Sequence, residues 1–200
     1  MEFSSNNYDQ KKTGTRFPVS SSNSNVTLSS VTYIKAEDCN SKNGAINFTF
    51  EKDGAIINHK RFLPDLDNVQ QRDGETLDQA KERSFKSFNA ILQHIGNKFT
   101  DNVTTGNNLI EYVKNWCGMM SKAVVGHKVY LKTILNNNGY TDLPKYPDFI
   151  QNMNSGECTL SYTDKEMEAN KQNEESRKVR MAGSSATPIV PGVGVPSAWS

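Results

Sequence analysis

The sequence predicts a mainly β fold with α-helices inserted between the third and fourth strands. Residues 45–51 alternate between apolar and polar side chains, which is the pattern of a half-buried strand. Asp53-Gly54 then favours a tight hairpin into a third strand at residues 55–63. From Leu77 the apolar residues instead recur at the 3.6-residue spacing of an amphipathic helix. This change of period predicts strands first and helices afterwards.

The remaining elements follow from the same two periods. Thr76 and Gln79 have the spacing of a capping box, which places the start of the first helix. Gly96 ends its apolar stripe. The expected elements are strands at residues 26–36, 45–51 and 55–63, a helical insertion at about residues 76–121, and strands at residues 124–135 and 157–163.

Two polar flanks enclose this region. Residues 1–24 are rich in Ser and Asn and predict a flexible N-terminal arm. Residues 164–200 are charged and then rich in Gly, Pro and Ser, with no periodic apolar face, and predict a disordered C-terminal tail. One domain, residues 25–163, therefore contains the core.

Five strands with a helix between the third and fourth have the chain order of the OB-fold. That fold is a partly open Greek-key barrel that binds oligonucleotides and oligosaccharides. Other small β-barrels and α+β sandwiches share the order. We expect a five-stranded OB-type barrel.

Composition excludes several classes of protein. The net charge of +1 is unlike that of a polybasic nucleic-acid binder, and no apolar run is long enough to span a bilayer. The first ten residues lack the apolar stretch of a signal peptide. Three widely spaced cysteines without a Cys-x-x-Cys pair favour reduced thiols over disulfides or a zinc site. We expect a soluble, intracellular protein without membrane contact.

No catalytic motif is present. The three histidines fall on different predicted elements, and no nucleophile or phosphate-loop signature occurs. Asp65 and Asp67 follow the third strand and offer a carboxylate pair for a metal, which makes a metal nuclease a distant alternative. We expect no catalytic residue, no metal and no cofactor.

Residues 128–132 point instead to a binding surface. In a strand, Val129 and Leu131 would face the core, while Lys128, Tyr130 and Lys132 would share the other face. In such an arrangement the aromatic ring can stack on a base, while the ammonium groups on either side neutralise the neighbouring phosphates. The alternative is a solvent face on which lysines only prevent pairing with other chains.

Other strands repeat this chemistry. Tyr33 and Lys35 would share a face of the first strand. The third strand offers to solvent either His59 and Arg61 or Lys60 and Phe62, with the parity undecided. Lys42 and Lys52 occupy the loops on either side of the second strand. The predicted DNA-binding residues are Tyr33, Lys35, Lys42, Lys52, Lys60, Arg61, Lys128, Tyr130 and Lys132.

Residues 26–163 resemble the small phage-encoded single-stranded DNA-binding proteins of OB type. The resemblance lies in the opening strand, the hairpin, the helix ending at residues 90–96, and the return strand at residues 125–132, near whose start Gly126 stands. It implies sequence-independent coating of single-stranded DNA during phage replication or recombination, in the host cytoplasm. It also implies replication or recombination proteins as partners through residues 164–200, although these mix basic and acidic residues where many such proteins have an acidic tail.

A second function remains open. The chain would then be a phage structural or virion-associated interaction protein, with the barrel as an assembly module and the apolar residues 188–199 as a docking segment. The sequence leaves the oligomeric state undecided.

Overall fold

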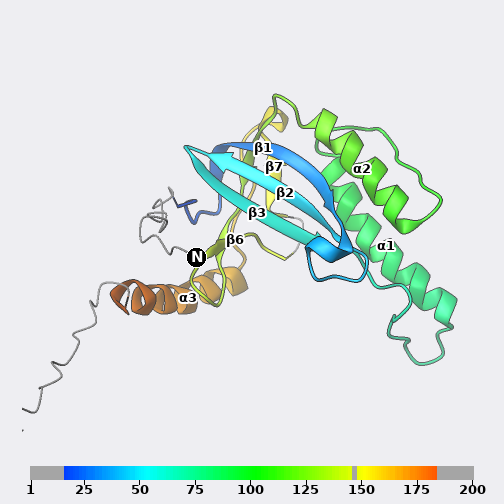
Figure 1. The fold of residues 1–200 in the computed structure, drawn as a ribbon. Helices are drawn as coiled ribbons and strands as arrows, with labels where there is room; N and C mark the ends of the chain where they lie inside the picture. Colours follow the sequence, from blue (N-terminus) through cyan, green and yellow to red (C-terminus); the bar gives the residue numbers. More distant parts are fainter. Residues whose placement is uncertain (1–15, 146–147, 184–200) are drawn as a thin grey trace, which may run out of the picture.

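A five-stranded antiparallel sheet organises the chain in the computed structural model, which describes residues 16–145 and 148–183 (Figure 1). The strands have the spatial order β3-β2-β1-β4-β7, and β5 and β6 form a separate two-stranded ladder. The strands are β1 (Asn23–Ile34), β2 (Ala45–Lys52), β3 (Ala55–Phe62), β4 (Lys128–Leu131), β5 (Ile134–Leu135), β6 (Thr141–Asp142) and β7 (Ile150–Asn152). The helices are α1 (Leu77–Gly96), α2 (Leu109–Ala123) and α3 (Asp164–Gly183), with short 3-10 turns at Ala36–Asp38 and Met153–Ser155.

The first four strands of the sheet form a Greek key, since their spatial order is β4-β1-β2-β3. The predicted antiparallel strands with helices inserted after the third are confirmed. The fold is mixed α/β, however, where the sequence predicted a mainly β one. The prediction of a barrel is wrong, because no ladder among the described residues joins the edge strands β3 and β7. Side chains lie between the edges instead: the ring of Phe149, just before β7, is 5.3 Å from the ring of His59 on β3.

A bulge divides β1 into two halves. The register shifts between Leu28 and Ser30, and the inserted residue reverses which parity faces the core. Leu28 is buried before the bulge and Val31 after it. Tyr33 therefore packs against the core, whereas unbroken alternation had placed it on the solvent face with Lys35. The prediction of that shared outer face is wrong.

Helices α1 and α2 cover one face of the sheet and contribute to the core. Phe48 and Phe50 of β2 are at most 1% exposed. The ring of Phe48 lies 6.1 Å from Trp116 of α2 in an edge-to-face arrangement. The Oγ of Ser121 donates a 2.7 Å hydrogen bond to the carbonyl oxygen of Val31, which joins α2 to β1. The core therefore lies between β1, β2 and the helical insertion.

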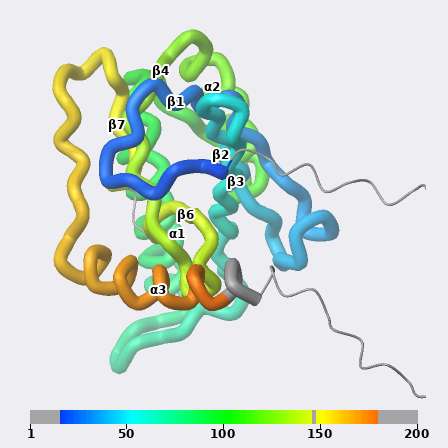
Figure 2. The backbone as a smooth tube through the Cα atoms, turned by 90° about the vertical axis from the view of Figure 1, so that its left-hand side faces the viewer, coloured from blue at the N-terminus to red at the C-terminus, as the bar shows by residue number. Residues whose placement is uncertain are grey.

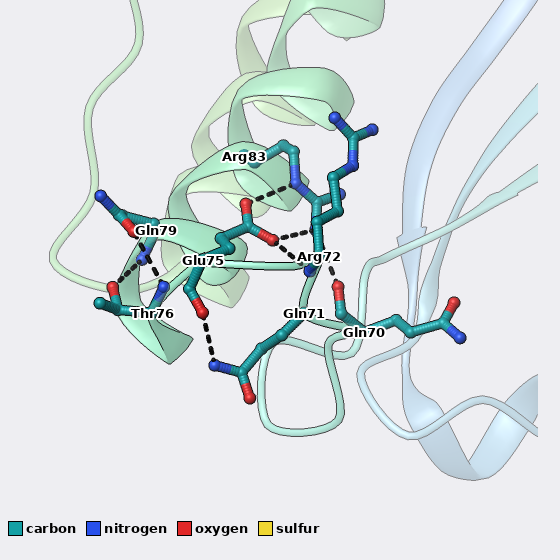
Figure 3. A network of polar contacts seen from close by, with 7 residues as sticks. All are labelled: Gln70, Gln71, Arg72, Glu75, Thr76, Gln79 and Arg83. Carbon is teal, nitrogen blue, oxygen red and sulfur yellow. Dashed lines mark hydrogen bonds and ion pairs between the residues drawn. The ribbon is translucent and has the colours of Figure 1, made fainter.

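A polar network fixes the connection from β3 into α1 (Figure 3). Glu75 accepts two 2.8 Å hydrogen bonds from the guanidinium of Arg83, and the backbone N–H of Arg72 donates a third at 2.9 Å. Next to it, Thr76 and Gln79 form the predicted capping box. The start of α1 is thereby held against the loop that follows β3. The Arg83 hydrogen bonds lower the pKa of Glu75 to about 2.

This network predicts a pH-dependent loss of stability. Because the pKa of Glu75 is lowered from about 4.5 to about 2 in the folded state, its stabilisation is complete above pH 4.5 and is lost as the pH falls toward 2. We expect Glu75→Gln to lower the melting temperature at pH 7 and to converge with the wild type near pH 2. Thermal unfolding followed by circular dichroism measures this. Glu157→Gln, at an exposed carboxylate, is the control and should show no such convergence. An equal deficit for Glu75→Gln at both pH values would contradict the pairing.

The C-terminal segment differs from the prediction. Residues 157–163 form no strand, and the last strand of the sheet is β7, earlier in the chain. The disordered tail is wrong for Asp164–Gly183, which forms α3 beside the β5–β6 ladder (Figure 2). Asn170 accepts a hydrogen bond from the backbone of Leu135 and Asn173 donates one to it, both 2.8 Å long. Helix α3 is held here by polar side chains and has no apolar stripe. A prediction from the spacing of apolar residues therefore does not detect it.

The N-terminal segment is partly ordered. Phe17 is 5% exposed and belongs to the core, and its carbonyl oxygen accepts a 2.9 Å hydrogen bond from Thr141. The flexible arm is therefore wrong for residues 16–24, while residues 1–15 and 184–200 lie outside the described residues. Within residues 16–145 and 148–183, no helix has the length and apolar character needed to cross a membrane.

Candidate nucleic-acid interface

A groove runs between the edge strand β3 and helix α1. It has a volume of about 430 Å³, and we call it the β3–α1 groove. Its described lining consists of His59, Lys60, Arg61, Phe62, Pro64, Ser84, Ser87, Phe88, Ile91 and Lys145. Three of these residues are cations, and the described lining includes no carboxylate. The floor is apolar, so the groove combines a positive charge with surface for a flat ring.

The cations come from two segments that are distant in sequence. Arg61 is half-buried, and its Nη1 donates a 2.9 Å hydrogen bond to the carbonyl oxygen of Lys145, which brings residue 145 to the edge of β3. Burial lowers the pKa of Arg61. Lys60 and Lys145 are exposed, and their ammonium groups form no hydrogen bond or ion pair with the described residues. Both charges are therefore free to meet an anion.

Aromatic side chains complete the groove. Phe62 is 53% exposed, so its ring is available for stacking. His59 lies deeper, with its ring 6.3 Å from that of Phe48. Burial lowers the pKa of His59, so its imidazole is neutral at pH 7. The positive charge of the groove at neutral pH thus comes from Lys60, Arg61 and Lys145.

The predicted outer face of residues 128–132 is confirmed only in part. Lys128 is exposed on the outer face of β4, where its Nζ contacts Thr27 of β1, and Tyr130 is half-buried on that same outer side. Lys132 is 4% exposed. Its Nζ lies 3.0 Å from Glu166 of α3 and also contacts the carbonyl oxygen of Ser161. The prediction that Lys132 shares a solvent face with Tyr130 is wrong, because β4 ends at Leu131.

Lys52 lies at the far end of the sheet. Its Nζ donates a 2.7 Å hydrogen bond to the carbonyl oxygen of Ser24. Together with Lys128 it lines a smaller pocket of about 290 Å³ beside the β2–β3 hairpin. Glu51 and Asp53 line the same pocket and offset its positive charge. This pocket is less suited to phosphates than the β3–α1 groove.

The other predicted residues have partners within the fold. Tyr33 donates a 3.1 Å hydrogen bond to the carbonyl oxygen of Asn43, and the Nζ of Lys114 lies 5.5 Å from the centre of its ring. Burial raises the pKa of Tyr33. Lys35 pairs with Glu37 at 3.5 Å.

Lys42 is similarly engaged. It lies 3.0 Å from a carboxylate oxygen of Asp65 and 3.0 Å from one of Asp67. The carboxylate pair considered for a metal therefore surrounds an ammonium group. Of the nine predicted residues, only Lys60 and Arg61 lie together in the β3–α1 groove.

The predicted set of DNA-binding residues omits Phe62 and Lys145, which line the groove. The sequence places Phe62 on the same face of the third strand as Lys60, but it does not decide whether that face is exposed. Lys145 lies in a loop without periodicity and reaches β3 only through the tertiary fold. Comparisons of the chain with models of protein families, with curated proteins and with solved structures found no match.

Proposed function

We propose that this protein binds single-stranded DNA, largely independently of sequence and without catalysing a reaction, through the β3–α1 groove. One observation carries the proposal: three cations and an exposed aromatic ring line a groove whose described lining has no carboxylate. Lys60, Arg61 and Lys145 would neutralise phosphates, and Phe62 would stack on a base. Each stacked base contributes about 1–3 kcal/mol, and every base offers a ring face, so such binding tolerates any sequence.

The topology supports the same proposal. The Greek-key order, the bulged β1 and the helices between the third and fourth strands are consistent with an OB-type architecture whose edges have not closed. We infer such a relationship as part of the proposal. A role in phage DNA replication or recombination rests on the sequence resemblance of residues 26–163. The alternative role in virion assembly was predicted from residues 188–199, which lie outside the described residues.

Single strands suit this groove better than a duplex. Stacking on Phe62 needs a base whose face is free, and in a duplex each base is already stacked between its neighbours. A common way to read a duplex is to place a helix or a two-stranded ribbon in the major groove. On α1, the residues facing the β3–α1 groove are Ser84, Ser87, Phe88 and Ile91, which carry no charge.

Replacing Phe62 with alanine tests the stacking. We expect Phe62→Ala to weaken binding to a fluorescently labelled dT oligonucleotide by about 5- to 150-fold, the equivalent of about 1–3 kcal/mol. Fluorescence anisotropy at low salt measures the affinity. Ile56→Ala is the matched control, because Ile56 is 60% exposed on the same strand but does not line the β3–α1 groove.

Two outcomes would count against the proposal in different ways. Equal affinity for the oligonucleotide and for a duplex of the same length would reject single-strand binding as the function. If the protein prefers single strands and Phe62→Ala does not weaken this binding, the proposed function holds but its site is not the β3–α1 groove.

A further inference from the structure

A second pocket lies on another side of α1, between α1, α2 and the residues 97–108 that join them. Its volume is about 490 Å³, and we call it the α1–α2 pocket. Figure 1 shows the two helices side by side, with this connection running back along α2 from the end of α1 to the start of α2. On α1 the pocket is lined by Phe85, Asn89 and Gln93, spaced four residues apart, whereas the β3–α1 groove uses Ser84 and Ser87. At about 100° per residue these sets face different directions, so the two sites are separate.

The pocket has aromatic walls. Phe85 and Tyr112 meet edge to face with their ring centres 5.7 Å apart, and Trp116 lines the inner end. The hydroxyl of Tyr112 donates a hydrogen bond to Oδ1 of Asn89, which orients the amide and leaves its N–H groups unused. Burial raises the pKa of Tyr112, so the phenol stays neutral. Flat apolar surfaces with oriented amides suit a flat ring that has polar edges.

Trp116 supplies an unused hydrogen-bond donor. The residue as a whole is 2% exposed, but its indole Nε1 is not among the buried side-chain atoms that lack a hydrogen-bond partner. Since this N–H donates no hydrogen bond to the described residues, we infer that it reaches the space of the pocket that Trp116 lines. Gly96, which also lines the pocket, leaves room beside this group: a Cβ on Gly96 would lie 3.5 Å from Nε1 of Trp116. An acceptor atom of a bound molecule would satisfy the donor.

Charge restricts the class of ligand. The described lining contains no lysine, arginine or histidine, and its one charged residue is Asp101. An anionic ligand would therefore meet a carboxylate and no compensating cation. A nucleotide or other phosphate ester does not fit such a site.

We propose that the α1–α2 pocket binds an uncharged planar heteroaromatic ring of the nucleobase class, as the free base or nucleoside. A ring nitrogen or carbonyl oxygen accepts the indole N–H of Trp116. The amides of Asn89 and Gln93 bind the polar edge of the ring, and the rings of Phe85 and Tyr112 contact its apolar parts. This site is independent of single-strand binding in the β3–α1 groove.

Gly96→Ala tests the site with a single methyl group. Isothermal titration of the full chain with adenosine, guanosine, cytidine and thymidine should detect binding of at least one nucleoside. We expect Gly96→Ala to weaken that binding about tenfold or more, because its Cβ narrows the space beside the indole donor. Gly118→Ala on α2 is the matched control: its Cβ meets nothing within 4 Å, Gly118 does not line the α1–α2 pocket, and the affinity should not change.

Further measurements complete the test. The indole ¹H–¹⁵N signal of Trp116, assigned with the help of Trp199→Phe, should shift on addition of the nucleoside. The corresponding 5′-monophosphate should bind more weakly, and Phe62→Ala should leave nucleoside binding unchanged. The proposal is overturned if none of the four nucleosides binds, or if Gly96→Ala binds the nucleoside as well as the wild type does. It is also overturned if the indole signal of Trp116 does not move or if the monophosphate binds more tightly than the nucleoside. Loss of nucleoside binding in Phe62→Ala would overturn it as well.

Discussion

Lys132→Met is expected to lower the free energy of unfolding by about 3 kcal/mol and to release α3 from the rest of the protein. Lys132 is 4% exposed, and its ammonium group lies 3.0 Å from the carboxylate of Glu166. Removing the ammonium group of Lys132 leaves the carboxylate of Glu166, whose side chain is 19% exposed, without an ion-pair partner. Urea denaturation followed by circular dichroism measures the loss. Limited proteolysis within residues 157–163 reports the release of α3.

Two further variants test whether the effect comes from the buried ion pair. Lys128→Met makes the same chemical change four residues earlier, at an exposed position on β4, and should cost little stability. Combining Lys132→Met with Glu166→Met should recover much of the stability, because an apolar pair often replaces a buried ion pair without loss. If Lys132→Met unfolds at the same urea concentration as the wild type, the ion pair does not hold α3.

Neutralising the three groove cations is expected to have the largest effect on DNA binding. For single strands, the logarithm of the affinity changes with the logarithm of the salt concentration by about 0.7 per neutralised phosphate. Replacing Lys60, Arg61 and Lys145 together with glutamine should therefore reduce this slope by about 2 and weaken binding at low salt. Anisotropy titrations of a dT oligonucleotide over a series of salt concentrations measure both quantities.

The control is a triple variant on α3 whose net charge changes by the same amount. Lys165, Lys171 and Lys178 are exposed on α3, and their joint replacement with glutamine should leave the salt slope near that of the wild type. If both triple variants reduce the slope equally, the protein binds through its overall charge. If neither does, the phosphates lie outside the β3–α1 groove.

Local signals in the sequence predicted the parts of the fold that are determined locally. The hairpin of β2 and β3 follows from alternation around Asp53-Gly54, and α1 begins at its capping box. The bulge in β1 shifts the alternation of side chains by one residue. A prediction from alternating residues does not detect such a shift, so it placed Tyr33 on the wrong face of the strand. Barrel closure failed as a prediction because it depends on contacts between β3 and the segment before β7.

The candidate site was predictable to a similar degree. Lys60 and Arg61 were identified, but alternation required a choice of parity. Since β3 is an edge strand beside α1, both side chains reach the groove from the two sides of the strand. Lys132 was misassigned because its surroundings are set by Glu166, which is 34 residues away in sequence. Short-range periodicity contains no information on such a partner.

The ring of Phe149 between the edges of the sheet has a mechanical consequence. In a closed barrel, widening the gap beside β3 would break a ladder of backbone hydrogen bonds, each worth about 0.5–1.5 kcal/mol net. In this protein the gap is bridged by ring contacts such as that between Phe149 and His59, and by the hydrogen bond from Arg61 to Lys145. Separating these rings costs contact energy but breaks no ladder hydrogen bond of the sheet. The gap between β3 and the segment before β7 can therefore widen while the sheet itself stays intact.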